Sequence, residues 1–316
     1  MKKAIMLLII CFAAWTIVNT PIVNNYVTGL QNESALPVVK ESDSLYNTIK
    51  KNAPTYEKQP SNAKIDPVWK AMPGYNGLKV NLSASYKNMK KSGEFDEDKL
   101  VYQQISPKVH LEDLSPSPIY RGHPDKPMVS FIINVAWGNE YLSSMLATLK
   151  KHHVSASFFL EGNWVKKNPE LAKMIVSAGH EVGNHSYSHP DMAKLTAAQA
   201  REQIQQTNEV IEAATEKKPT LFGPPSGSYR EETVKVAHKL KMKTIMWTVD
   251  TVDWKKPTPE ILINRVMKKI DNGSMVLMHP TESTATSLDR LIKQIKQKDL
   301  QIGTVSDLLG EERIMK

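Results

Sequence analysis

Two histidines four residues apart are the first side chains in this sequence whose type and spacing could do chemistry. His185 and His189 stand in the stretch Gly-Asn-His-Ser-Tyr-Ser-His-Pro. In a helical or tightly turned backbone this spacing projects both imidazoles to one side, where two neutral nitrogens can bind a single Zn²⁺ ion. The pair is a weak signal alone, because nine histidines in 316 residues produce such a spacing by chance. A metal site therefore needs support from other residues.

Three further polar groups follow short apolar runs later in the chain. Asp250 and Asp253 come after the run 243–249, His279 follows another run, and residues 222–227 form a Gly-Pro-rich loop. The position of His279 after an apolar run, together with the Asp-x-x-Asp-Trp stretch at 250–254, favours a functional role for this histidine. The structural alternatives are a buried His279 satisfied by a carboxylate, and aspartates that only cap the following turn.

The elements that must position these residues are alternating strands and helices. Thr196 and Gln199 form a capping box that marks the start of one long helix. Alternation of this kind implies a parallel sheet or barrel, with its chemistry at the carboxyl ends of the strands. Strands are predicted at 129–135, 154–160, 243–249, 274–278 and 300–303, and helices at 141–152, 169–178, 196–214, 231–240, 260–270 and 287–297.

The sequence before this region divides by composition. Lys2 and Lys3 precede an apolar run that ends near Pro21, which predicts an export signal or a membrane anchor. The predicted parts are a signal or anchor at 1–23, a polar spacer at 24–64, a small α/β module at 65–118, a linker at 119–127 and the barrel at 128–310. Within the module, strands are expected at 78–82 and 100–105 and a helix at 83–91.

Charge and cysteine content restrict the partners and the compartment. The net charge of +8 and the pI near 9.2 indicate either an anionic partner, such as a cell-wall polymer or membrane surface, or simply a solvated basic surface. Nucleic-acid-binding motifs are absent from the sequence, so nucleic acid is not an expected partner. The only cysteine, Cys11, lies in the predicted signal, so the exported part can form no disulfide. The protein is expected outside the cytoplasm, secreted or anchored to the membrane.

The order of these motifs over residues 128–308 resembles the polysaccharide deacetylases with the NodB-homology domain, carbohydrate esterase family 4. Three of the five family motifs are intact: H-S/T-x-x-H at 185–189, D-x-x-D-W at 250–254 and L-x-H at 277–279. The resemblance implies an α/β fold, an irregular (β/α)7 barrel. Together with the signal and spacer, it is similar to an exported, sporulation-associated branch of the family.

The resemblance also implies a mechanism. A zinc-like divalent ion held by an aspartate, His185 and His189 would activate a water that attacks the N-acetyl carbonyl of a cell-wall glycan, such as peptidoglycan or a chitin-like polymer. His279 would protonate the leaving amine, with Asp253 or Asp250 holding its ring. The expected substrate-pocket residues are Trp254, Leu277, Pro225 and Tyr187.

The first and third family motifs are degenerate at the residues that carry this chemistry. Where the family has T-F-D-D-G, with the base and metal aspartates, Ala136 and Trp137 replace both carboxylates. The arginine that orients the base is Gly223, and the following aromatic is Ser226. We expect Trp137 to fill the place of the missing carboxylate and so block the site. We also expect two neutral ligands to bind a divalent ion weakly or not at all.

Three functions remain open from the sequence. The favoured one is an N-deacetylase with weakened catalysis, for which Asn139 or Glu140 could supply a further ligand. The second is an inactive descendant that binds glycan or a sporulation partner. The third is a different hydrolase that uses His279 and Asp253 without metal.

Overall fold

The computed structural model describes residues 43–315, which form two compact units. Unit 1 contains the described residues up to Glu57 together with Leu78–Gln103, and unit 2 contains Lys58–Gly77 and the residues from Gln104 onward. The predicted signal or anchor and Cys11 lie outside the described residues. No helix within residues 43–315 is both long and apolar enough to cross a bilayer.

Unit 1 is built on helices α3 (Ser44–Tyr56) and α4 (Leu82–Met89), with strand β3 (Gly77–Val80) paired to β4 (Tyr102–Ile105). The sequence predicted α4 and both strands, but α3 falls in the predicted spacer, and that interpretation was wrong for residues 44–56. Asp43 begins α3 by accepting hydrogen bonds from the first turn. Only one apolar residue per turn of α3 is buried, namely Leu45, Ile49 and Ala53. So narrow an apolar stripe gives only a weak helical pattern in the sequence.

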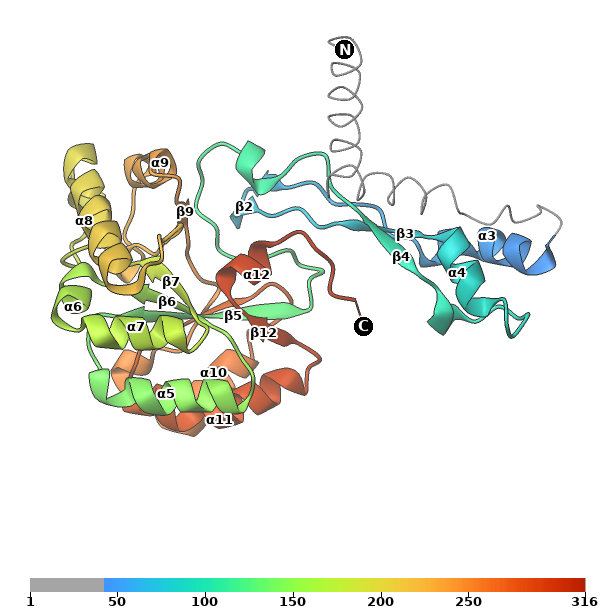
Figure 1. Cartoon of the computed structure of the whole chain (residues 1–316). Helices are drawn as coiled ribbons and strands as arrows, with labels where there is room; N and C mark the ends of the chain where they lie inside the picture. The colour runs from blue at the N-terminus through green and yellow to red at the C-terminus, as the bar shows by residue number, and fades with distance from the viewer. Residues whose placement is uncertain (1–42, 316) are drawn as a thin grey trace, which may run out of the picture. The chain divides into compact units, whose positions relative to one another are not determined.

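Unit 2 contains a curled sheet of parallel strands in the order β10-β11-β5-β6-β7-β8-β9, with β12 paired to β5. The strands β9 and β10 are close in the chain but stand at opposite ends of this order, so the sheet must curl to bring its ends together (Figure 1). This confirms the predicted α/β fold and its parallel barrel-like sheet. The strands are β5 (Met128–Val135), β6 (Ser157–Leu160), β7 (Glu181–Asn184), β8 (Leu221–Phe222), β9 (Lys243–Thr244), β10 (Val249–Asp250), β11 (Met275–Met278) and β12 (Gln301–Gly303).

The single strand predicted at 243–249 is in fact two strands. The backbone N–H of Ile245 bonds to the β8 carbonyl of Phe222, whereas that of Thr248 bonds to Met275 on β11. Between them, Met246 bonds to the carbonyl of Ile119, which is buried. The segment therefore changes partners at the closure of the sheet, and residues 119–127, predicted as a linker, begin with a residue packed inside unit 2.

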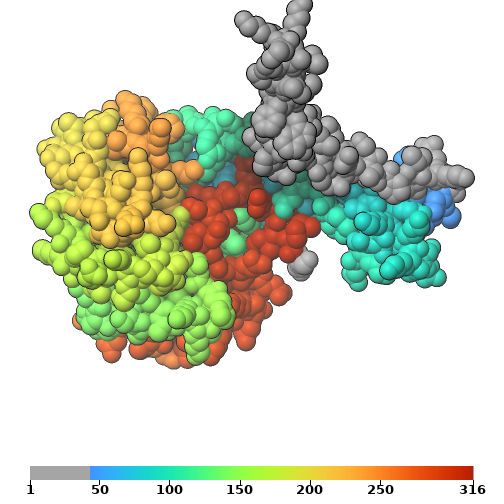
Figure 2. All heavy atoms as spheres, viewed as in Figure 1, coloured from blue at the N-terminus to red at the C-terminus, as the bar shows by residue number. Residues whose placement is uncertain are grey.

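Helices cover the outside of this sheet. The helices α10, α11 and α5 pack side by side, and α7, α8 and α9 form a second row (Figure 1). On the face of unit 2 seen in the space-filling view, α5, α7, α8, α9 and the C-terminal segment lie at the surface (Figure 2). The capping box at Thr196 is confirmed at the start of α8. The helices are α5 (Asn139–Lys151), α6 (Gly162–Lys167), α7 (Pro169–Ser177), α8 (Ala197–Thr215), α9 (Glu231–Lys239), α10 (Pro259–Met267), α11 (Glu282–Lys296) and α12 (Val305–Leu309).

Alternate residues of β5 face two different cores. Phe131 and Ile133 belong to the larger core that includes residues of the surrounding helices, whereas Ile132 packs with Phe159 and Leu277 inside the curled sheet. Because the side-chain period of a strand is two, Asn134 lies on the same inner side as Ile132. This places an amide at the carboxyl end of β5.

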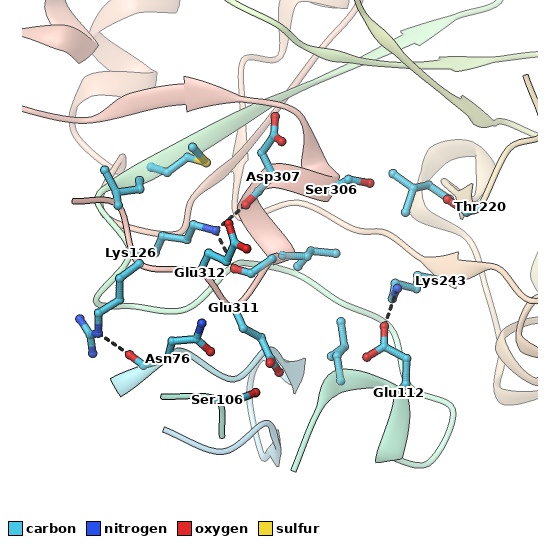
Figure 3. Close-up of a pocket in the computed structure, with 17 residues that line it drawn as sticks. Asn76, Ser106, Glu112, Lys126, Thr220, Lys243, Ser306, Asp307, Glu311 and Glu312 are labelled. Carbon is cyan, nitrogen blue, oxygen red and sulfur yellow. Dashed lines mark hydrogen bonds and ion pairs between the residues drawn. The ribbon is translucent and has the colours of Figure 1, made fainter. Parts of the chain in front are cut away.

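The C-terminal tail, residues 310–315, lies near the amino ends of β5, β8 and β9. It lines a cavity of about 720 Å³, which also contains the buried side chain of Lys126 (Figure 3). The Lys126 ammonium donates to the carbonyl of Asp307 and, at 2.6 Å, to that of Gly310. The guanidinium of Arg313 lies 4.1 Å from the centre of the Tyr75 ring. These contacts hold the tail against the segments that precede the barrel strands. The hairpin β1 (Lys64–Asp66) and β2 (Lys70–Met72) completes unit 2.

We expect the free energy of unfolding to decrease as the pH is lowered below about 6.5. Protonation of His180 in the unfolded chain accounts for part of this decrease. Its ring is buried, its Nδ1 accepts the N–H of Ala156 at 3.2 Å, and burial lowers its pKa from 6.5 to about 4. Between these values the unfolded chain binds a proton that the folded chain does not. The full stabilisation is therefore present above the unfolded pKa, and about 2 kcal/mol is lost between pH 7 and pH 5. Urea unfolding at the two pH values measures this.

The variant His180→Asn keeps an acceptor near Ala156 but cannot titrate, so its stability should change less with pH. The exposed His238 provides the control, because His238→Gln should leave the pH dependence unchanged. A His180→Asn protein with the wild-type pH dependence would contradict this assignment.

Candidate functional site

The polar residues predicted after the strands meet in one cavity of about 450 Å³. Strands β5, β7, β10 and β11 all lead into its wall, as expected at the carboxyl ends of parallel strands. The cavity is lined by Asn134, Ala136, Trp137, His185, His189, Ser226, Trp247, Asp250, Trp254, Leu277 and His279.

His279 is held by a buried aspartate. The Nδ1 of its ring lies 2.8 Å from Oδ1 of Asp253, which has no exposed surface. The other carboxylate oxygen accepts the His279 backbone N–H at 2.6 Å and the Thr284 hydroxyl at 2.6 Å. This arrangement fixes the ring with Nδ1 toward the aspartate and leaves Nε2 for the cavity. The ring can therefore hold or donate a proton at Nε2.

Of the two aspartates predicted for this role, the structure places Asp253 rather than Asp250 against the ring. Asp250 accepts the N–H of Val252 at 2.7 Å in the turn that follows β10. It still lines the cavity. Its observed bond is that of an aspartate capping a turn.

The two histidines of the first motif face each other in a tight turn after β7. Their ring centres are 5.1 Å apart, and the backbone reaches this geometry with positive φ angles at Ser186 and His189. The Nδ1 of His185 donates to the carbonyl of Gly223 at 2.7 Å, which leaves its Nε2 unprotonated. Burial lowers the pKa of His185 to about 3, and the loss of surrounding water also lowers the pKa of His189. Both rings are therefore neutral near pH 7.

The pair lacks the further ligand that a catalytic zinc site requires. In the part of the chain from 43 to 315, no three His, Cys, Asp or Glu side chains are grouped so that they could hold a metal ion. Asn139, which was considered as a further ligand, is bonded to Trp164 Nε1 at 2.6 Å and to Asn168 at 2.9 Å. Glu140 lines a neighbouring cavity instead. The two imidazoles share the cavity with the methyl group of Ala136 and the indole of Trp137, which cannot bind zinc. The residues present therefore do not fit a catalytic zinc centre, which needs three protein ligands.

Trp137 does not block the cavity, so that expectation was wrong. Its side chain is 47% exposed, and its ring lies parallel to that of His279, with centres 5.9 Å apart and planes 8° apart. The indole thus forms part of the wall and leaves the cavity open. It also lines a second cavity of about 510 Å³, which shares Ala136 with the first.

The structure brings only part of the predicted substrate pocket together. Trp254 and Leu277 line the cavity as expected, whereas Pro225 and Tyr187 are not among its lining residues. Pro225 is buried in the turn behind Ser226, and the Tyr187 ring packs against Gly162.

Sequence reasoning missed two residues of the wall. Asn134 stands inside an apolar strand and Trp247 inside the stretch predicted as one strand, so both resemble core positions in the sequence. The strand period could have placed Asn134 on the inner face. No pattern in the sequence marks Trp247.

Gly223, the residue expected to replace the family's arginine, lies in close contact with the inner core. Its N–H donates to the Asn184 carbonyl at 2.9 Å, and a Cβ atom at this position would come within 2.8 Å of the fully buried Phe159 ring. The space that a side chain would need at this position is therefore already occupied.

Comparison with known proteins shows which sequences this chain resembles. The family model for polysaccharide deacetylases matches residues 121–245. The uncharacterized protein YlxY of Bacillus subtilis is 53% identical over 98% of this chain and 97% of its own length. A peptidoglycan-N-acetylglucosamine deacetylase of Bacillus cereus is 34% identical over 54% of this chain and 63% of its own length.

Solved structures are similar over most of the chain. The crystal structure of BA3943 from Bacillus anthracis, described as a CE4 family pseudoenzyme, has a TM-score of 0.83 and 57% identity, and covers 86% of this chain and 97% of that one. A mutant of BA3943, with a TM-score of 0.83 and 56% identity, is described as having restored enzymatic activity.

We expect Gly223→Ala to lower the free energy of unfolding by about 1 to 3 kcal/mol, because the new methyl group overpacks the core against Phe159. Gly310→Ala is the matched control, since its Cβ would meet its nearest neighbour at an ordinary 3.4 Å. Urea unfolding of the two variants measures the difference. Equal free energies of unfolding for the two variants would show that the Phe159 ring can move aside without destabilising the protein.

Proposed function

The chain belongs to the polysaccharide deacetylase family, carbohydrate esterase family 4, and from this premise we propose that it binds N-acetylated cell-wall glycan in the cavity beside His279. We further propose that it hydrolyses N-acetyl groups far more slowly than family members that carry both aspartates of the first motif. One observation carries this proposal: the buried Asp253 holds His279, while Ala136 and Trp137, which can act neither as a base nor as a metal ligand, line the same cavity.

The retained half of the site can supply the proton for a leaving amine. Asp253 fixes His279 so that Nε2 faces the cavity, the position from which an imidazole donates. The missing half is the group that accepts a proton from the attacking water, because the Ala136 methyl cannot do so. A positioned base contributes about 10² to 10⁴ in rate, so its loss alone makes hydrolysis slow.

The proposed ligand is peptidoglycan or a related glycan, on the basis of the substrate in the name of the Bacillus cereus relative. Such a polymer lies outside the cytoplasmic membrane, in agreement with the export or anchoring predicted for residues 1–23. The apolar wall formed by Trp254 and Leu277 suits the methyl of an acetyl group.

For the wild-type protein, we expect binding of N-acetylglucosamine oligomers together with acetate release at least about 100-fold slower than that of the Bacillus cereus relative assayed in parallel. Calorimetry measures the binding, and an enzymatic acetate assay with added zinc measures the turnover. His279→Ala should reduce any residual release further and leave binding largely intact. Turnover equal to that of the relative would mean that other groups replace the missing base and ligand.

Restoring the two carboxylates should restore chemistry. We expect Ala136→Asp combined with Trp137→Asp to raise bound zinc to about one ion per chain, because the pair of histidines gains a third ligand. Acetate release should increase by about 10² or more, because the second aspartate supplies a base. Elemental analysis and the acetate assay measure the two effects.

The matched control replaces both residues by Asn, which has a similar shape but no charge, and should show neither effect. Gly223 is left unchanged in both variants because a side chain there meets Phe159. A double-aspartate protein that binds zinc but releases no acetate would show that Ala136 does not occupy the position of the base.

A further inference from the structure

Asn134 is a buried amide without a partner. Its side chain is 6% exposed, lies on the inner side of β5 and forms part of the cavity wall. Within residues 43–315 its Oδ1 has no hydrogen-bond partner. A buried polar group of this kind destabilises the ligand-free protein, and a ligand that pairs with it removes the penalty.

The chemistry of this amide selects its ligand. A primary amide offers one acceptor oxygen and two donor hydrogens. A secondary amide, such as the acetamido group of a hexosamine, presents the complementary carbonyl and N–H. The charged amine of a deacetylated sugar presents donors only, and it would favour the carboxylate of Asp250, which also lines the cavity.

Trp137 adds an exposed apolar face beside this amide. Trp137 and Trp254 are the exposed tryptophans within residues 43–315, at 47% and 56%, and both line this cavity. Indole faces bury large apolar areas in complexes and carry one polar N–H. A hexose ring has an apolar C–H face that can cover such a surface. The cavity volume of about 450 Å³ lies in the range of small-ligand sites.

We propose that Asn134 and Trp137 turn this cavity into a recognition site for one N-acetylhexosamine unit, with Asn134 pairing with the acetamido group and Trp137 stacking on the sugar ring. This inference rests on the proposed glycan binding and names the residues that give it specificity. Because Trp137 also lines the neighbouring cavity of about 510 Å³, a longer oligomer can continue past it.

The test compares the binding of chitotetraose with that of its fully deacetylated counterpart by calorimetry on the full-length protein. The wild type should prefer the acetylated oligomer. Asn134→Leu, which keeps the volume and removes the amide, should weaken chitotetraose binding about tenfold and leave the deacetylated oligomer unaffected. Asn88→Leu makes the same chemical change at an exposed position on α4 and should change neither affinity.

Trp137→Ala should weaken both oligomers to a similar degree, and Trp137→Phe should retain most of the affinity, since only the ring face is required. Saturation-transfer NMR on the wild-type protein gives a second measurement that needs no variant. The strongest transfer is expected at the acetyl methyl protons.

The outcomes separate this inference from the proposed function. Absence of binding to either oligomer overturns the proposed function and the inference together. Chitotetraose binding with unchanged selectivity in Asn134→Leu overturns the inference alone. A wild-type preference for the deacetylated oligomer, or weak transfer at the acetyl methyl, also overturns it.

Discussion

The burial of β5 on both faces is the constraint on which the rest of unit 2 depends. All eight residues of this strand are buried, and it pairs with β11, β6 and β12. Its odd-numbered residues belong to one core and its even-numbered residues point into the curled sheet, so a shift of one residue would exchange the two sets. The register that buries Phe131 therefore also fixes where Asn134, Ala136 and Trp137 stand.

The two halves of the site are supported independently. Asp253 is fully buried and accepts hydrogen bonds from His279 and Thr284, so removing either partner would leave a buried carboxylate poorly compensated. His185 is held by the carbonyl of Gly223 and needs no ion to keep its orientation. Neither His279 nor His185 therefore depends on a carboxylate at position 136 or 137 for its orientation.

The sequence predicted those features whose signal is local. The run that became β5 and the capping box of α8 are examples, and so are the motifs that place His185, His189 and His279 around one cavity, with Asp253 buried behind His279. It failed where tertiary contacts decide the structure. The stretch 243–249 has a continuous apolar pattern, yet it divides because its N–H groups bond first to β8 and later to β11. Neither that exchange of partners nor the packing of Tyr187 on Gly162 is encoded in nearby residues.

Trp137 shows that a large aromatic side chain just after β5 need not close the cavity. An indole introduced beside neutral histidines gains most by burial, which would have filled the cavity. The next residue, Gly138, packs directly against the carbonyl of Pro280 in the loop after β11, and its φ of 82° is poorly accessible to other residues. The Trp137 indole lies parallel to the His279 ring, with nearly half of its surface exposed. The cavity therefore stays open beside Ala136 and Trp137, and the indole gives its wall an exposed aromatic face.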